Sequence, residues 1–75
     1  MYYVERVEDK LKVFNNDIQI LSLNLPLQED YVLPITAVML AHCPPDVKVM
    51  VLRKAISSVL SKVKQYQNST YAKKL

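Results

Sequence analysis

Few residues in this sequence are of the types that carry out chemistry. His42 and Cys43 are adjacent, but neighbouring residues on a helix point about 100° apart, and the chain has no second histidine or cysteine to complete a zinc site. Glu29 and Asp30 form a carboxylate pair that could act as general acid and base, or simply as acids in the first turn of a helix. Glycine is absent, which excludes the glycine-rich loops that bind nucleotide phosphates. We therefore expect no enzymatic activity, no metal site and no cofactor.

The charges are divided unequally along the chain. Up to Asp46 the sequence carries seven acids and three bases, and after Asp46 it carries seven bases and no acid. A basic segment of this kind favours an anionic partner, nucleic acid above all. The alternative is a solvent-exposed helix face whose lysines lie toward the negative end of the helix.

Seventy-five residues make a single small domain with a marginal core, so we expect a homodimer. One cysteine cannot form an internal disulfide, which favours a reducing, cytoplasmic location. No stretch approaches the ~20 apolar residues of a membrane span, so no membrane partner is expected. Within the domain we expect an N-terminal arm or hairpin over residues 1–16, a core over 17–67 and a flexible tail over 68–75.

Strands are expected in the first third of the chain. Residues 2–7 and 10–14 are rich in Tyr, Val and Phe and could form a hairpin or an irregular arm. A turn at residues 15–17 then leads into a strand over residues 18–25, which ends at Pro26. Because side chains alternate along a strand, its two faces carry different residues. Leu21, Leu23 and Leu25 are expected to point inward, and Ile20, Ser22 and Asn24 outward.

Two helices are expected after the strand. Residues 27–43 favour a helix with Pro34 near its start or at a kink, and a strand over residues 35–40 is the alternative. From Pro45 to about Tyr66 the apolar residues recur at helical spacing. They are Val49, Leu52, Ile56, Val59, Val63 and Tyr66. The expected fold class is α+β, with short N-terminal strands followed by two helices in a dimer. The alternative is a small β-meander plus a long C-terminal helix.

The strand and helices resemble the ribbon-helix-helix family of DNA-binding regulators. The resemblance rests on ILSLNLP at residues 20–26 and on VLRKAI at residues 51–56, which is similar to the family's second helix, and it covers residues 18–66. In that family the strands of two protomers pair into an antiparallel ribbon that enters the DNA major groove. The resemblance implies that Ile20, Ser22 and Asn24 read base edges.

The resemblance also implies a phosphate contact at the start of the second helix. The backbone around residues 45–47 would hold the phosphate, with Lys48 nearby. The basic side chains of Arg53 and Lys54 complete the expected DNA-binding set.

The same helix is also similar to one in the small dimerising subunit of the KEOPS tRNA-modification complex. That resemblance is carried by Leu52, Arg53, Ile56, Ser58, Leu60 and Lys64. The function we expect is a small homodimeric regulator of transcription that inserts a β-ribbon into the major groove of double-stranded DNA. The alternative is a non-catalytic structural or assembly subunit that docks a protein partner through its C-terminal amphipathic helix.

Overall fold

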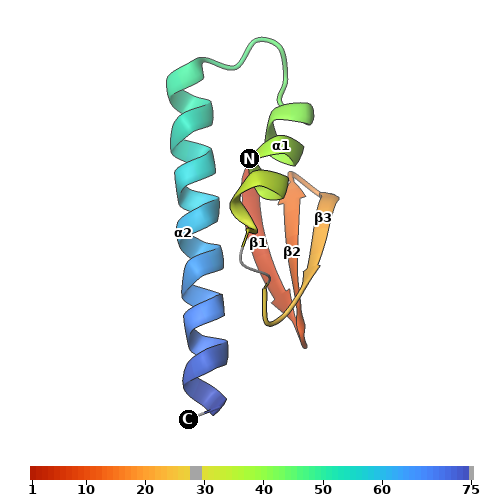
Figure 1. The fold of residues 1–75 in the computed structure, drawn as a ribbon. Coiled ribbons are helices and arrows are strands. Elements are labelled where there is room, and N and C mark those ends of the chain that lie inside the picture. Colours follow the sequence, from red (N-terminus) through yellow and green to blue (C-terminus); the bar gives the residue numbers. More distant parts are fainter. Residues whose placement is uncertain (28–29, 75) are drawn as a thin grey trace.

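The computed structural model describes residues 1–27 and 30–74, with the side chains of residues 1–27 and 30–68. Three strands come first: β1 (Tyr2–Val7), β2 (Lys10–Asn15) and β3 (Ile18–Asn24). Helices α1 (Val32–Ala41) and α2 (Val49–Lys74) follow. Each strand pairs antiparallel with its neighbour in sequence, so the sheet order is β1-β2-β3 (Figure 1). The expected α+β class, with strands first and two helices after them, is confirmed. The strands form a three-stranded meander within one chain.

Two short turns set the register of the meander. Each contains a non-glycine residue with positive φ, namely Glu8 at 58° and Asn16 at 57°. Asparagine tolerates this left-handed region, and the expected turn at residues 15–17 is present. A glutamate there costs about 1–2 kcal/mol. The short connection at Glu8 nevertheless holds Val7 opposite Lys10 and thereby aligns every residue of β1 with β2.

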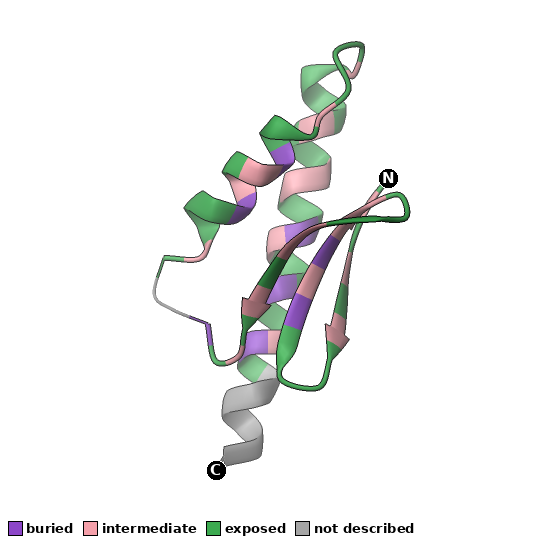
Figure 2. Ribbon diagram, turned by 90° about the vertical axis from the view of Figure 1, so that its right-hand side faces the viewer, coloured by how far each residue is buried: buried purple, intermediate pink, exposed green. Residues whose placement is uncertain are grey.

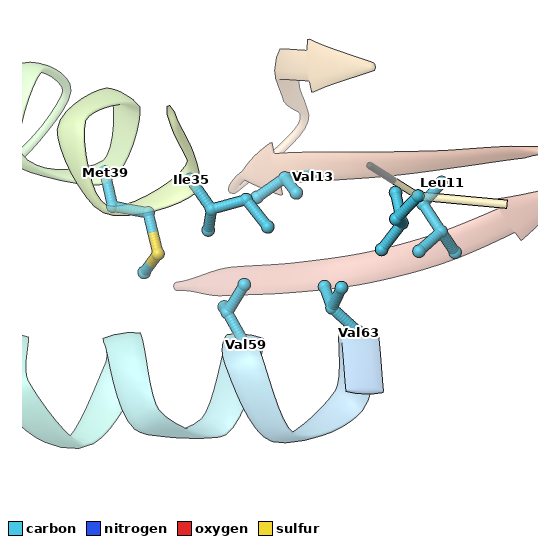
Figure 3. Close-up of a cluster of buried hydrophobic side chains, with 7 residues drawn as sticks. Leu11, Val13, Ile35, Met39, Val59 and Val63 are labelled. Atoms are coloured by element: carbon cyan, nitrogen blue, oxygen red, sulfur yellow. The ribbon is translucent and has the colours of Figure 1, made fainter. Parts of the chain in front are cut away.

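The buried side chains of both helices pack against the same side of the sheet, which we call its inner face. Figure 2 looks onto the opposite side, with α2 behind the strands. Apolar side chains from the two layers meet between them (Figure 3). The buried cluster comprises Leu11 and Val13 of β2, Ile35 and Met39 of α1, Val59 and Val63 of α2, and Leu27. The expected inward leucines of β3, Leu21 and Leu23, pack against the margin of this core, as does Leu25 beyond the strand.

Helix α1 confirms the helical interpretation of the segment after the strand and places Pro34 in the first turn. The first four amides of a helix have no intrahelical partner, so the missing N–H of Pro34 removes no helical hydrogen bond. The first backbone bond after it is donated by the Ile35 amide to the Tyr31 carbonyl, at 3.3 Å. Ile35 and Met39, which share the apolar side of the helix, are fully buried. Residues 28–29 of this segment lie outside the described residues.

Helix α2 differs from expectation at both ends. It begins at Val49 rather than Pro45, because residues 45–46 form a turn in which the Val47 amide donates to the Pro44 carbonyl. The helix continues to Lys74, past the expected end near Tyr66. Its apolar stripe is used within the chain: Val59 and Val63 are buried, and Ile56 and Tyr66 pack against them.

Gln67 ties α2 to the connection between β3 and α1. Its Oε1 accepts a hydrogen bond from the Leu27 amide at 2.9 Å, and its Nε2 donates to the Leu27 carbonyl at 3.4 Å. Both Gln67 and Leu27 are buried. The side-chain amide therefore satisfies the two backbone groups of a residue that belongs to no strand or helix, in a place where water would otherwise be needed.

Candidate nucleic-acid interface

The side of the sheet that faces away from the helices, the outer face, presents an open surface of mixed polar and aromatic residues. In Figure 2 α2 lies behind the strands and α1 lies beside the β3 edge, so in the described part of the chain neither helix crosses this face. Side chains alternate along each strand, so the outer face can be assigned from the buried residues and the pairing. It comprises Tyr3, Glu5 and Val7 of β1, Lys10, Lys12 and Phe14 of β2, and Gln19, Ser22 and Asn24 of β3.

The register brings lysines and small polar residues side by side on this face. Lys12 is paired with Ser22, and Lys10 is paired with Asn24. Directly paired side chains in an antiparallel sheet have Cβ atoms about 4.5–5.5 Å apart. Ser22, Asn24 and Lys10 are exposed and Lys12 is half-buried. The β2–β3 hairpin therefore carries a block of two cations and two hydrogen-bonding side chains. Two acids adjoin the block: Glu5 of β1 is opposite Lys12, and Asp30 lines a hollow together with Ser22 and Asn24.

Ile20 does not lie on the outer face, so its expected outward orientation is wrong. The pairing of β2 with β3 shifts between Val13 and Phe14: Val13 pairs with Leu21, whereas Phe14 pairs with Gln19. Ile20 is the extra residue of this β-bulge, and a bulge interrupts the alternation of side chains. Ile20 is half-buried and packs against the core beside Leu21. Of the three expected base-reading residues, Ser22 and Asn24 remain on the outer face.

Two aromatic rings stack at the other end of the outer face. The ring centroids of Tyr3 and Phe14 are 4.9 Å apart and their planes are inclined by 11°. Tyr3 remains 41% exposed, so the stack offers a flat apolar surface to solvent. Sequence reasoning did not find this pair. The signal was present, because a two-residue turn at residues 8–9 would place Tyr3 directly opposite Phe14.

The expected helix contacts lie elsewhere. Lys48, Arg53 and Lys54 are all exposed. Lys48 precedes α2, whereas Arg53 and Lys54 belong to α2, which lies behind the sheet in Figure 2. The expected phosphate contact at residues 45–47 is also altered, because the Val47 amide is bonded to Pro44. The first helical hydrogen bond is donated by Leu52 to the Lys48 carbonyl, so the free amides begin after Lys48.

The residues considered for catalysis or metal binding are dispersed. His42 follows α1 and is exposed, and its carbonyl accepts a hydrogen bond from Asn15 Nδ2 at 2.9 Å. The Cys43 thiol donates to the Pro44 carbonyl at 3.4 Å. Glu29 lies outside the described residues. Within residues 1–27 and 30–74, no three His, Cys, Asp or Glu side chains gather as metal ligands could.

Comparison with known proteins places the chain in no family. No protein-family model, no curated protein and no solved structure matches it. Neither helix, over the part of the chain that the structure describes, has the length and apolar content that crossing a bilayer requires.

Proposed function

We propose that this chain is a DNA-binding protein whose contact surface is the outer face of its sheet. The observation that supports the proposal is the β2–β3 register, which sets Lys12 beside Ser22 and Lys10 beside Asn24. The strand that resembles a ribbon-helix-helix strand has no basic residue of its own on this face. The pairing with β2 supplies two. A block of cations and amide or hydroxyl groups has the composition that phosphate and base-edge contacts need.

The β2–β3 hairpin is the part of the sheet that would enter the major groove. That groove is about 12 Å wide and admits a two-stranded β-ribbon. Asn24 can form paired hydrogen bonds with adenine, Ser22 can bond several bases, and Lys10 and Lys12 can reach guanine or a phosphate. Arg53 and Lys54, on the helix layer, would add long-range attraction without reading sequence.

A homodimer would extend the same surface. Among the described strands β3 is at the end of the sheet next to β2, and the start of α1 adjoins part of its edge at the hollow lined by Ser22, Asn24 and Tyr31. Pairing with β3 of a second copy, as in the ribbon-helix-helix arrangement, would join two outer faces into one. Ser22 and Asn24 of both copies would then lie at its centre, flanked on either side by the lysines of β2. We propose this edge as the dimer contact of the DNA-binding form.

The test is binding of mixed-sequence duplex DNA, followed by fluorescence anisotropy at low and at physiological salt. Each phosphate neutralised contributes about 0.9 to the slope of log affinity against log salt, so Lys10→Gln with Lys12→Gln should lower the slope by about 2 for each bound chain, or about 4 for a bound dimer. The matched control, Arg53→Gln with Lys54→Gln, removes the same charge from the helix layer and should leave the slope nearly unchanged. A larger effect of the control pair would contradict the outer face, and no binding even at low salt would contradict DNA binding itself.

Recognition of the DNA base sequence is tested in a separate experiment. The unaltered protein should bind duplexes that it has selected from a random pool more tightly than it binds the pool itself. Combining Ser22→Ala with Asn24→Ala should remove this difference in affinity. Affinity for unselected DNA should change little, because these side chains carry base contacts rather than phosphate contacts. Retention of the full preference by the double variant would refute their assignment.

One observation favours the second candidate function, a structural or assembly subunit. The first turn of α2 exposes three apolar side chains in a row: Val49, Met50 and Val51 are 68%, 72% and 57% exposed. Within the apolar stripe Val59 and Val63 are buried and Ile56 and Tyr66 pack against them, so docking through α2 would centre on this turn. Sedimentation of the purified chain with and without Met50→Glu tests it: self-association that the substitution abolishes would support a protein-docking role for this turn.

A further inference from the structure

A groove runs between the free edge of β1 and α2. It adjoins the outer face at Tyr3 and includes none of the outer-face residues of β2 and β3. Two adjoining hollows form it, with volumes of about 490 Å³ and about 300 Å³. They share Tyr2 of β1 and Ser58 of α2 as lining residues. Together they follow α2 from Lys54 to Lys62, which is about 12 Å of helix, so an extended segment of chain suits them.

One wall of the groove is an unpaired strand edge. β1 has β2 as its one neighbour in the sheet. The Asn16 amide donates to the Met1 carbonyl, which makes that pair a hydrogen-bonded one. Hydrogen-bonded and non-hydrogen-bonded pairs alternate along an antiparallel ladder. The backbone groups of Tyr2, Val4 and Arg6 therefore point away from β2, toward the groove side, where a further strand could pair with them.

The other wall is a row of α2 side chains at intervals of four residues, which lie on one side of a helix. Lys54, Ser58 and Lys62 form this row and line the two hollows. Both lysines are exposed, and Lys62 Nζ lies 5.6 Å from the centre of the Tyr66 ring. No acidic residue is found among the described residues that line either hollow.

The floor between these walls is apolar and narrow. Val51, Leu52 and Ala55 contribute to it, and the small side chain of Ala55 leaves room above the helix. Tyr2 is held in place because its hydroxyl donates to the Met39 carbonyl at 2.9 Å. An apolar side chain that entered here would be removed from water and would pack against these apolar side chains.

We propose that this groove binds an extended peptide as an added strand on β1, with acidic residues at positions i and i+4 and an apolar residue at i+2. Charge complementarity selects the acids, because the helix wall is cationic. The spacing follows from geometry. Lys54 and Lys62 are eight residues apart, which is about 12 Å along a helix, and four residues of a strand span about 13 Å. Side chains i, i+2 and i+4 of a strand point the same way.

This binding mode combines two sources of affinity. Main-chain hydrogen bonds to Tyr2, Val4 and Arg6 would hold any strand, and the side-chain pockets would select its sequence. The inference does not depend on DNA binding, because it uses neither the lysines of β2 nor the exposed residues of β3.

The experiment uses the full chain and a fluorescently labelled peptide with glutamates at i and i+4, leucine at i+2 and threonine elsewhere. A control peptide of the same composition has its second glutamate at i+3, which points to the opposite side of a strand. Anisotropy at physiological salt should show binding of the first peptide, and affinity for the second should be about tenfold lower. No binding of the first peptide, or equal binding of both, would overturn the proposal.

Charge reversal locates the site. Lys54→Glu combined with Lys62→Glu should weaken the first peptide about tenfold, because two partly screened ion pairs become repulsive. Arg53→Glu combined with Lys64→Glu makes the same change of net charge on side chains that do not line the groove, and should change affinity about twofold or less. A peptide with lysines at i and i+4 should bind the Lys54, Lys62 double variant better than it binds the unaltered protein. Equal losses in the two double variants would show attraction to net charge alone and overturn the proposal.

The added strand has its own spectroscopic signature. In amide NMR spectra the peptide should move the resonances of Tyr2, Val4 and Arg6 more than those of β3. Shifts confined to α2 would overturn strand addition.

Discussion

β2 serves two different surfaces with alternate residues. Leu11 and Val13 are fully buried under both helices, whereas Lys10 and Lys12, beside them in the strand, face the other way. The inner residues are constrained by packing, because a core at crystal-like density tolerates little change in volume. The outer residues have no such constraint from the fold. Two lysines opposite Ser22 and Asn24 are therefore more informative about function than the leucines are, and substitutions on the two faces should separate stability from binding.

The largest effect should come from the inner face. Leu11→Ala removes a fully buried side chain from the centre of the cluster and should lower the free energy of unfolding by about 2–5 kcal/mol. Urea unfolding followed by circular dichroism, at one fixed protein concentration, measures it. Lys12→Ala on the outer face is the control and should stay within about 0.5 kcal/mol. Equal losses in the two variants would remove the distinction between the faces.

The next largest loss of stability should come from the Gln67 bridge, by which we mean the two hydrogen bonds between the Gln67 side chain and the Leu27 backbone. Gln67→Ala leaves the amide and carbonyl of Leu27 buried without their side-chain partner, which costs about 1–3 kcal/mol. The adjacent Asn68→Ala changes an exposed side chain and serves as the control in the same unfolding measurement. If both substitutions were neutral, the bridge would contribute nothing to holding the β3–α1 connection.

The stacked pair of Tyr3 and Phe14 could contribute both to stability and to binding, because it lies on the outer face and is partly buried. A double-mutant cycle with Tyr3→Ala and Phe14→Ala should give a coupling free energy of about 0.5–1.5 kcal/mol, the range for stacked rings. A coupling of zero would show that the two rings stabilise the sheet independently. Loss of DNA affinity in the single variants, beyond the change in stability, would extend the proposed DNA-contacting surface to this end of the sheet.

The smallest effect is a difference in pH dependence. Burial raises the pKa of Tyr2 above its ordinary value of 10.0, and the negative charge of the Cys43 thiolate raises it further. The folded state thus holds the proton more tightly than the unfolded chain. Stability from this group is fully present below about pH 10 and is lost as the pH rises through the raised pKa.

Tyr2→Phe tests this assignment. The variant should lose the hydrogen bond to Met39 at neutral pH, and its stability should then fall less steeply than that of the unaltered protein above about pH 10. Urea unfolding midpoints of the two proteins, measured from neutral pH to above about pH 10, give both the loss at neutral pH and the alkaline slope. Parallel declines would mean that Tyr2 contributes nothing to the alkaline slope.

The features that sequence reasoning predicted were those that depend on local pattern. Alternation placed Leu21 and Leu23 inward, and a proline compatible with a first helical turn favoured a helix in the segment that contains α1. The orientation of Ile20 could not be obtained this way, because a bulge is a property of two paired strands rather than of one. The start of α2 was missed because a proline suits a turn as well as a first helical position.

The candidate site was predicted only in part, because the pairing between strands cannot be read from one strand. Ser22 and Asn24 were found from a single strand, but Lys10 and Lys12 join them only through the pairing of β2 with β3. The Gln67 bridge spans forty positions of sequence, from residue 27 to residue 67, and no periodicity signals a contact of that kind.

The same long span has a consequence for the order of events during synthesis. The three strands and α1 are complete by residue 41, yet the helix that covers Leu11 and Val13 ends far later, and Leu27 finds its partner only when residue 67 has been added. Ribosomes add about 5–20 residues per second, so a nascent chain carries an uncovered apolar sheet for seconds. The sheet is therefore synthesised first, but its apolar side is covered only after α2 has been made. A chain that ends before residue 67 should be a target for chaperones and proteases.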